Sequence, residues 1–157
     1  FRRVLFRSKE TKMKILVQKV LNASVSVNQQ LVSQIDRGFL LFIGVEKGDT
    51  HTQADFLTKK IANLRIFEDE NNKMNLSIQD VKGEILAVSQ FTLAADLSRG
   101  NRPGFESAAR PEEAKQLYEY FVEQLQTYNL PVQTGIFQAD MKVALVNDGP
   151  CTFILQK

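Results

Sequence analysis

The chain has 157 residues, 43% of them hydrophobic and 24% charged, which suits one globular domain built on its own core. Residues 1–12 hold five of the 20 Lys and Arg but one of the 18 Asp and Glu, so 15 basic and 17 acidic residues remain from Met13 onward, a balance of −2. The overall charge of +2 therefore does not indicate a nucleic-acid-binding surface. A local patch can still bind phosphates, and the candidates are Lys59, Lys60, Arg65, Arg99 and Arg102.

The first twelve residues precede Met13, which has the position of an initiator. We predict that residues 1–12 are a non-native leader, derived from a vector or from mistranslation upstream, and that residues 13–157 form the domain. A secretory or transit peptide is the competing interpretation, but no apolar stretch of adequate length follows the basic residues. A cytoplasmic protein is therefore expected.

The chain offers few residues for several common kinds of site. Its one cysteine, Cys151, excludes an internal disulfide, and its one histidine, His51, excludes metal sites built on several His or Cys. No metal site is predicted. No stretch approaches the about 20 apolar residues that cross a bilayer, so a membrane function is not expected.

The first third of the chain has the pattern of β-strands, at 15–20, 24–27, 31–35 and 39–45. The last of these is apolar on both faces, so it should lie centrally in the sheet. A turn at Gly48-Asp49-Thr50 leads into a helix, which Thr50 and Gln53 can start with a capping box. The apolar residues spaced for its buried face are Phe56, Leu57, Ile61 and Leu64.

The rest of the chain predicts more strands and a second helix. Strands are expected at 74–78 and 85–89, and residues 94–107 have no regular period, which is typical of a functional loop. A helix should begin at Pro111 and end by Pro131, with Leu117, Tyr118, Phe121, Val122 and Leu125 on its apolar face. Strands at 132–135, 141–146 and 152–155 complete a count of eight or nine. The ratio of eight or nine strands to two helices predicts an α/β, β-rich fold. We expect a strongly curved, barrel-like mixed sheet with the two helices packed outside it.

Two short segments carry the strongest functional signal. Ser89-Gln90-Phe91-Thr92-Leu93 places hydroxyls and an amide where strand 85–89 ends, and Asn147-Asp148-Gly149-Pro150 places Gly before Pro near the end of the chain. Together they resemble the signature pair of the D-aminoacyl-tRNA deacylases, the D-tyrosyl-tRNA deacylase family. The resemblance extends from Met13 to Lys157 through further blocks at 13–20, 38–45, 100–105 and 139–143. One departure is Gln138, where the family is expected to have Gly, which puts the local backbone geometry in question.

The resemblance implies an enzyme that hydrolyses D-aminoacyl-tRNA, and mischarged glycyl-tRNA, to free tRNA and amino acid without a cofactor. It implies the family's fold in a two-fold symmetric homodimer. The Gly149-Pro150 peptide bond would be cis and, with Asn147, would enter the partner's active site and reject L-residues by steric exclusion. The catalytic residues carried over by motif are Ser89, Gln90, Phe91 and Thr92. Met141 is a candidate for the amino-acid pocket, and Arg102 for contact with the 3′ end of tRNA.

The residues also limit the mechanism. A nucleophilic triad needs a base, and the one histidine, His51, lies at the start of a surface helix. Cys151 beside an apolar run is more typical of a packed residue. The aminoacyl ester is activated, and the vicinal 2′-hydroxyl of the ribose can assist attack, so the enzyme must chiefly hold the substrate and stabilise the oxyanion with backbone N–H groups. The Thr92 hydroxyl as nucleophile remains the alternative.

Two other functions remain open at this point. One is a binding module of the same fold that holds nucleic acid without hydrolysing it, which the lack of a recognisable nucleophile favours. The other is an editing domain selective for one L-residue, as in the related fold attached to some threonyl-tRNA synthetases. The Gly149-Pro150 segment argues against the editing domain.

Overall fold

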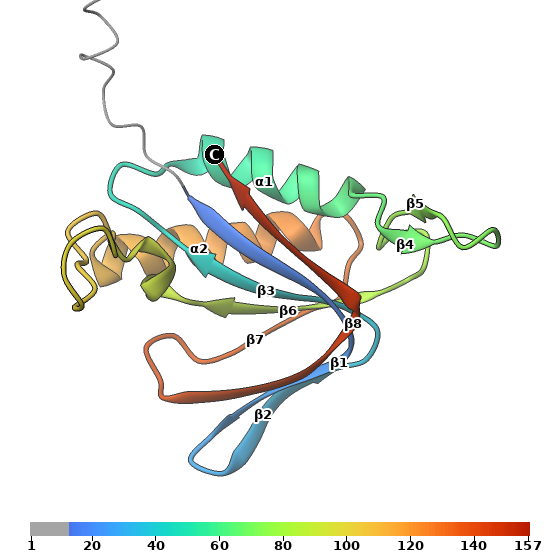
Figure 1. Cartoon of the computed structure of the whole chain (residues 1–157), viewed down its shortest axis with the longest axis horizontal. Coiled ribbons are helices and arrows are strands. Elements are labelled where there is room, and N and C mark those ends of the chain that lie inside the picture. Colours follow the sequence, from blue (N-terminus) through green and yellow to red (C-terminus); the bar gives the residue numbers. More distant parts are fainter. Residues whose placement is uncertain (1–12) are drawn as a thin grey trace, which may run out of the picture.

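The computed structural model describes residues 13–157, so the expectation of a leader at 1–12 lies outside the described residues. A curved sheet carries both long helices on one side, and the first and last strands run side by side (Figure 1). The elements in chain order are β1 (Lys14–Val27), β2 (Gln30–Ile35), β3 (Gly38–Gly44), α1 (His51–Asn63), β4 (Phe67–Glu68), β5 (Met74–Leu76), β6 (Glu84–Ser89), the 3₁₀ helix η2 (Phe91–Ala94), α2 (Pro111–Gln126), β7 (Val132–Thr134) and β8 (Met141–Gln156).

The main sheet is mixed and bends until its edges approach each other. Its order is β2-β1-β3-β6-β7, with β8 paired to β1; β3, β6 and β7 are parallel, and the other pairs are antiparallel. At the far side β2 meets β7, where the Ser33 hydroxyl donates to the Thr134 carbonyl and the Gln34 N–H donates to Gln133 Oε1 at 3.0 Å. The predicted barrel-like mixed sheet with two packed helices is confirmed, and β3 lies at its centre as expected.

Alternating residues of the central strands fill two cores, one on each face of the sheet. Phe39, Leu41 and Ile43 of β3 pack with the helices, while Leu40 packs inside the curve of the sheet with Leu86 and Val88 of β6. The two-sided burial explains why these strands are almost continuously apolar. Within the described residues, no helix is long and apolar enough to cross a membrane.

The helices begin where the sequence predicts. Thr50 caps α1, with its hydroxyl accepting from the Thr52 N–H at 3.3 Å, while Gln53 Oε1 accepts from the Thr50 N–H at 2.8 Å. Pro111 opens α2, where its missing N–H costs no helical hydrogen bond. The expectation that Phe56 is buried is wrong. α1 instead buries Ala54, Leu57, Thr58, Ile61 and Ala62, which turns Phe56 outward, 43% exposed, with the Lys157 ammonium 4.5 Å from its ring centre.

Several strand boundaries differ from the prediction. The segments 15–20 and 24–27 belong to one strand, β1, and 141–146 and 152–155 to one strand, β8. The register between these two strands shifts on either side of Val20, and such a bulge breaks the alternation by which a strand is recognised. β1 therefore changes cores along its length: Ile15 and Val17 face the helices, whereas Ala23 and Val25 face the inside of the curve.

Candidate active site

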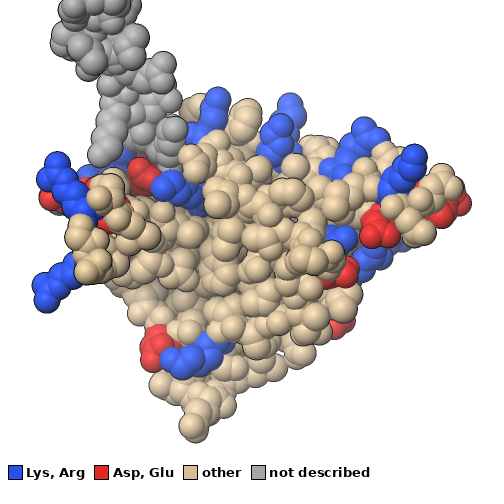
Figure 2. Space-filling view, viewed as in Figure 1, with Lys and Arg blue, Asp and Glu red and all other residues tan. Residues whose placement is uncertain are grey.

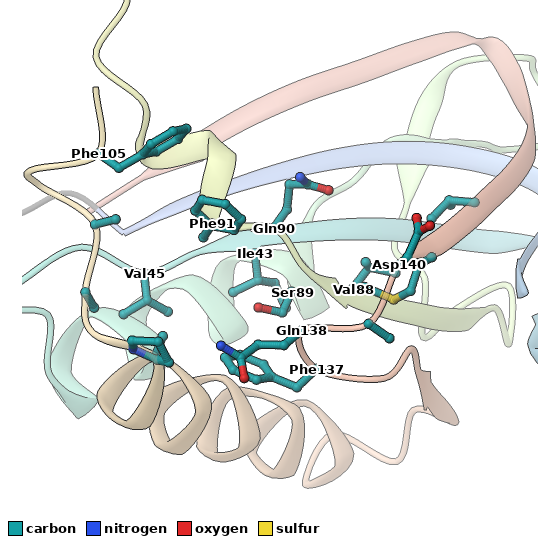
Figure 3. A pocket seen from close by; sticks show the side chains of 17 residues that line it. Ile43, Val45, Val88, Ser89, Gln90, Phe91, Phe105, Phe137, Gln138 and Asp140 are labelled. Carbon is teal, nitrogen blue, oxygen red and sulfur yellow. The ribbon is translucent and has the colours of Figure 1, made fainter. Parts of the chain in front are cut away.

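A cavity of about 650 Å³ opens at the carboxyl ends of β3 and β6. Its walls come from these strand ends, from η2, from the start of α2 and from the segment that leads into β8 (Figure 3). In an open parallel sheet this is the edge at which ligands bind. The lining residues are mostly apolar, and the polar ones are Ser89, Gln90, Gln138 and Asp140.

The sheet ends at this cavity because the chain turns sharply after Ser89. The Gln90 N–H still donates to the Ile43 carbonyl at 2.8 Å, as in the ladder, but the next residue, Phe91, begins η2. The N–H groups of Phe91 and Thr92 are the first of this helix, and the first N–H groups of a helix have no carbonyl partner within it. Gln90, the residue before η2, offers them no side-chain cap. Of these two residues, Phe91 lines the cavity.

The side chains of the Ser89 to Thr92 segment differ in their placement. Ser89, Gln90 and Phe91 line the cavity, whereas Thr92 is not among the lining residues. The Thr92 hydroxyl accepts a hydrogen bond from the Gln90 side-chain amide. Phe91 is 58% exposed, and its ring centre lies 5.1 Å from that of Phe105. The two rings form an apolar rim.

The opposite wall is the connection from β7 to β8, which supplies Phe137 through Met141. Met141 lines the cavity as the sequence predicts and packs over Gly135, where a Cβ would stand 2.4 Å from the Met141 sulfur. The Phe137 ring faces Tyr118 at 6.1 Å between centres, and the Tyr118 hydroxyl donates to the Ala87 carbonyl at 2.7 Å. Burial raises the pKa of the Tyr118 hydroxyl above its ordinary value, so this donor stays protonated.

The Asn147-Pro150 segment lies on β8, away from this cavity. The Asn147 side-chain amide donates to the Lys19 carbonyl at 3.1 Å and to the Cys151 carbonyl at 3.2 Å. Lys19 is only 5% exposed, and its ammonium stands 4.0 Å from the Asp148 carboxylate. These contacts fix the segment against β1 at the point where the register of the two strands shifts.

The backbone of Gly149 is unusual, with φ +116°, a region that L-residues rarely adopt. Every peptide bond in the described residues is trans, so the expectation of a cis bond between Gly149 and Pro150 is not met. Trans is the lower-energy isomer of an X–Pro bond by about 0.5–1 kcal/mol, and the hydrogen bond from the Asn147 amide to the Cys151 carbonyl spans the segment with this bond trans. Neither Gly149 nor Pro150 lines the cavity of its own protomer, and both are exposed.

The remaining candidates lie outside the cavity. Arg102 lines a second cavity of about 540 Å³ together with Arg99. His51 stacks on Tyr120 with ring centres 3.7 Å apart, and Cys151 is buried, as a packed residue should be. Burial also raises the pKa of the Cys151 thiol, which disfavours a thiolate nucleophile.

Several walls of the cavity were not predicted from the sequence. Phe105, Phe137 and Ala114 come from segments far apart in the chain, and no local pattern connects them. The one available signal was the aperiodic stretch 94–107, which contains Phe105. Gln138, which stands where the family is expected to have Gly, has φ +66° and lies in the cavity wall. This departure from the family pattern was therefore a second signal of the site.

Comparison with known proteins agrees with this fold. The model of the family D-Tyr-tRNA(Tyr) deacylase matches residues 16–156. A protein of Geotalea uraniireducens named D-aminoacyl-tRNA deacylase is 61% identical over 92% of this chain and 93% of its own length, and one of Geotalea daltonii with the same name is 57% identical over 92% and 96%.

Two solved structures are also similar. One, titled c-Myc DNA Unwinding Element Binding Protein, is 41% identical with a TM-score of 0.87, and the match covers 92% of this chain and 99% of that one. The other, titled as a structural analysis of a probable eukaryotic D-amino acid tRNA deacylase, has a TM-score of 0.80 over 93% and 100% of the two chains. At 16% identity it supports the fold alone.

The family match and the similar proteins together define the class of protein as a hydrolase of aminoacyl-tRNA. The chain belongs to the D-Tyr-tRNA(Tyr) deacylase family, which its sequence matches over nearly all the described residues.

Proposed function

We propose that the protein hydrolyses the ester bond of D-aminoacyl-tRNA, and of glycyl-tRNA, releasing free tRNA and the amino acid. The observation that carries the proposal is the cavity at the ends of β3 and β6, which brings Ser89, Gln90 and Phe91 together beside the first N–H groups of η2. The names of relatives at 61% and 57% identity support the same activity. Because aminoacyl-tRNA is used by the ribosome, the proposal places the protein in the cytoplasm.

The proposed chemistry needs few side chains. The carbonyl of the ester approaches the N–H groups of Phe91 and Thr92, which stabilise the negative charge that develops on its oxygen. The 2′-hydroxyl of the terminal ribose assists the attack of water, so the protein supplies position rather than a nucleophile. Two placements support this assignment: His51 is held against Tyr120 away from the cavity, and the Thr92 hydroxyl accepts a hydrogen bond from Gln90.

We propose a two-fold homodimer in which the Gly149-Pro150 segment of one protomer closes the cavity of its partner. The segment is exposed and does not line its own cavity, so it is free to fill another. The apolar side chains Val146, Phe153 and Ile154 of β8 are also exposed, Ile154 to 65%, and few charged residues occupy the middle of the face in Figure 2. Burial of this surface would favour association.

The same segment provides a mechanism for chiral selection. Backbone atoms of Gly149 and Pro150 would stand where the side chain of an L-residue must go, while a D-residue or glycine leaves that space empty. Selection then depends on steric exclusion and requires no contact with a particular side chain.

The second cavity is suited to the 3′ end of tRNA. Arg99 and Arg102 line it, and guanidinium groups bind phosphates well. It adjoins the first cavity because one short segment forms part of both: Gly104 and Glu106 line the second cavity, and Phe105 between them lines the first. A terminal nucleotide with its ester in the first cavity would therefore extend its phosphate backbone into the second.

A binding module without hydrolytic activity is the second candidate, because a relative at 41% identity has a name that describes DNA binding. The two candidates differ in one outcome: the module leaves the D-aminoacyl ester intact at saturating protein, and the deacylase does not.

Single-turnover hydrolysis of matched D-tyrosyl-, L-tyrosyl- and glycyl-tRNA tests the proposal. We expect fast turnover of the D and glycyl esters and negligible turnover of the L ester. Persistence of both D and glycyl esters with folded protein would overturn the proposal in favour of the binding module, and faster turnover of the L ester would favour an L-selective editing domain.

Two variants separate the parts of the mechanism. Gly149→Ala with Pro150→Ala should lose D activity or admit the L ester, whereas Gly48→Ala, at another glycine of positive φ outside the site, should strain the backbone without either effect. Thr92→Ala should retain near-normal turnover, and a collapse of turnover in this variant, if it is folded, would establish the hydroxyl as nucleophile.

A further inference from the structure

The outer face of α1 carries positive charge around an exposed aromatic ring. The Lys157 ammonium lies 4.5 Å from the centre of the Phe56 ring, and the Lys60 ammonium lies 5.7 Å from it. Lys59, beside Lys60 on the helix, is also exposed. We call Phe56, Lys59, Lys60 and Lys157 the basic patch. The face of an aromatic ring attracts ammonium groups, so Phe56 brings together two like charges that would otherwise repel each other.

The lysines of the basic patch form no ion pair with any residue that the structure describes. Asp55 lies one turn before Lys59, a usual position for such a pair, but its carboxylate accepts from the Tyr120 hydroxyl of α2 at 2.6 Å. Figure 2 shows Lys and Arg side chains along the upper edge of the molecule, where Figure 1 places α1. Ammonium groups gathered on one surface without carboxylates favour a polyanionic partner.

The basic patch is connected to the second cavity through the start of α1. The Lys47 N–H donates to the Ser107 carbonyl at 2.9 Å, and Ser107 lines the second cavity, beside the two arginines that we propose bind the 3′ end of tRNA. Lys47 is exposed and shortly precedes His51, the first residue of α1. At 1.5 Å per residue, Lys60 lies about 14 Å along the helix from His51. Basic side chains therefore extend from the second cavity along α1.

Resting on the proposed function, we propose that the basic patch binds the phosphate backbone of the acceptor duplex of tRNA. The aminoacylated end of a tRNA is a short single strand, and a duplex lies behind it. With the ester in the first cavity and the single strand along the second, the duplex reaches α1, where the lysines bind its phosphates. Duplex RNA is recognised mostly through its shape and backbone, so the patch contributes affinity for tRNAs of any acceptor sequence.

Two RNAs and two charge-matched variants test this inference. One RNA is an uncharged hairpin that has an acceptor duplex and its single-stranded 3′ end, and the other is that single strand alone. Lys60→Gln with Lys157→Gln removes both ammonium groups from the Phe56 ring. Lys73→Gln with Lys82→Gln is the control, because both lysines are exposed and Lys82 precedes β6, at the edge of the sheet opposite the first cavity.

The affinity of each protein for each RNA is measured as a function of salt concentration. We expect the Lys60, Lys157 variant to bind the hairpin less tightly than the full chain does. Its slope of log affinity against log salt should be smaller by about 1.8, because each lost phosphate contact of a duplex removes about 0.9. Its affinity for the single strand should not change, and the control variant should match the full chain with both RNAs.

An unchanged slope for the hairpin, or an equal change in the control variant, would overturn the inference. Equal weakening of the hairpin and the single strand would also overturn it, because the patch would then act on the 3′ end. Both RNAs are uncharged, so these outcomes do not depend on hydrolysis. If D-tyrosyl-tRNA persists with the full chain, the proposed function fails, but a smaller slope in the Lys60, Lys157 variant still supports the basic patch.

Discussion

Removing the side chain of Asn147 should reduce activity more than its loss of stability explains. Asn147→Ala deletes the hydrogen bonds to the Lys19 and Cys151 carbonyls, at 3.1 and 3.2 Å. At a net value of about 1 kcal/mol each, their loss lowers the free energy of unfolding by about 2 kcal/mol. For a chain of about 150 residues this corresponds to a fall in Tm of about 4–8 °C.

The effect on turnover follows from the position of the lost bonds. The bond to Lys19 holds β8 to β1 two residues before Gly149, and the bond to Cys151 closes the segment within β8, so their loss releases the segment that we propose enters the partner's cavity. A displacement of about 1 Å at a catalytic site can reduce the rate about a hundredfold. We therefore expect single-turnover hydrolysis of D-tyrosyl-tRNA, measured well below the melting transition, to fall by more than tenfold.

The assay combines thermal unfolding at fixed protein concentration with that single-turnover rate. Thr50→Ala is the comparison, because it removes a helix cap remote from the cavity and lowers stability without affecting the segment. A loss of less than about 0.5 kcal/mol in Asn147→Ala would show that the two hydrogen bonds are not supporting β8. Normal turnover in a destabilised Asn147→Ala would separate the segment from catalysis and refute the reasoning.

Three further outcomes are expected. Thr50→Ala, which breaks the capping box with Gln53, should cost about 1 kcal/mol in a denaturant melt and leave turnover unchanged; a neutral effect would mean that the cap is replaced by water. Burial raises the pKa of the Cys151 thiol above its ordinary value of 9.0, so the folded protein holds this proton more tightly than the unfolded chain does. The stability that this difference provides is therefore present below pH 9 and falls as pH rises above it. Iodoacetamide should accordingly label Cys151 slowly at pH 8 unless urea is added, and rapid labelling of folded protein would contradict its burial. Replacing Arg99 and Arg102 by Ala should weaken tRNA binding and reduce the slope of log affinity against log salt by about 0.7 per lost phosphate contact; an unchanged slope would exclude the second cavity as a phosphate site.

The features of the fold that depend on residues close together in the chain were predicted correctly. The Thr50 and Gln53 pair, and Pro111 at a helix start, satisfy backbone groups within a few residues, so their effect is visible in the sequence. The central position of β3 was likewise predictable, because burial on both faces demands an unbroken apolar strand. Phe56 was misassigned because helical spacing alone did not fix which flank of α1 faces the sheet.

The candidate site was predictable only in part. Polar residues directly after an apolar strand located Ser89 to Phe91 at the cavity, but Phe105 and Phe137 reach it through tertiary packing, which no local pattern contains. The bulge between β1 and β8 was missed because an extra residue reverses the alternation of side chains. Family resemblance added the Asn147 to Pro150 segment, whose bond geometry it did not predict correctly for this protomer.

The pairing of the first and last strands has a consequence for synthesis of the protein. Met13 and Lys157 exchange two backbone hydrogen bonds, each of 3.1 Å, so the pairing of β1 with β8 forms only after β8 has been synthesised. Contacts between residues that are far apart in the chain form slowly, because they close a long loop. The connection into β8 that carries Gln138, and the strand that carries Gly149, are among the last parts made. A nascent chain cut short before β8 would thus lack both Met141, which lines the cavity, and the segment that we propose selects the substrate. We therefore expect such a truncation to abolish activity rather than to relax its selectivity.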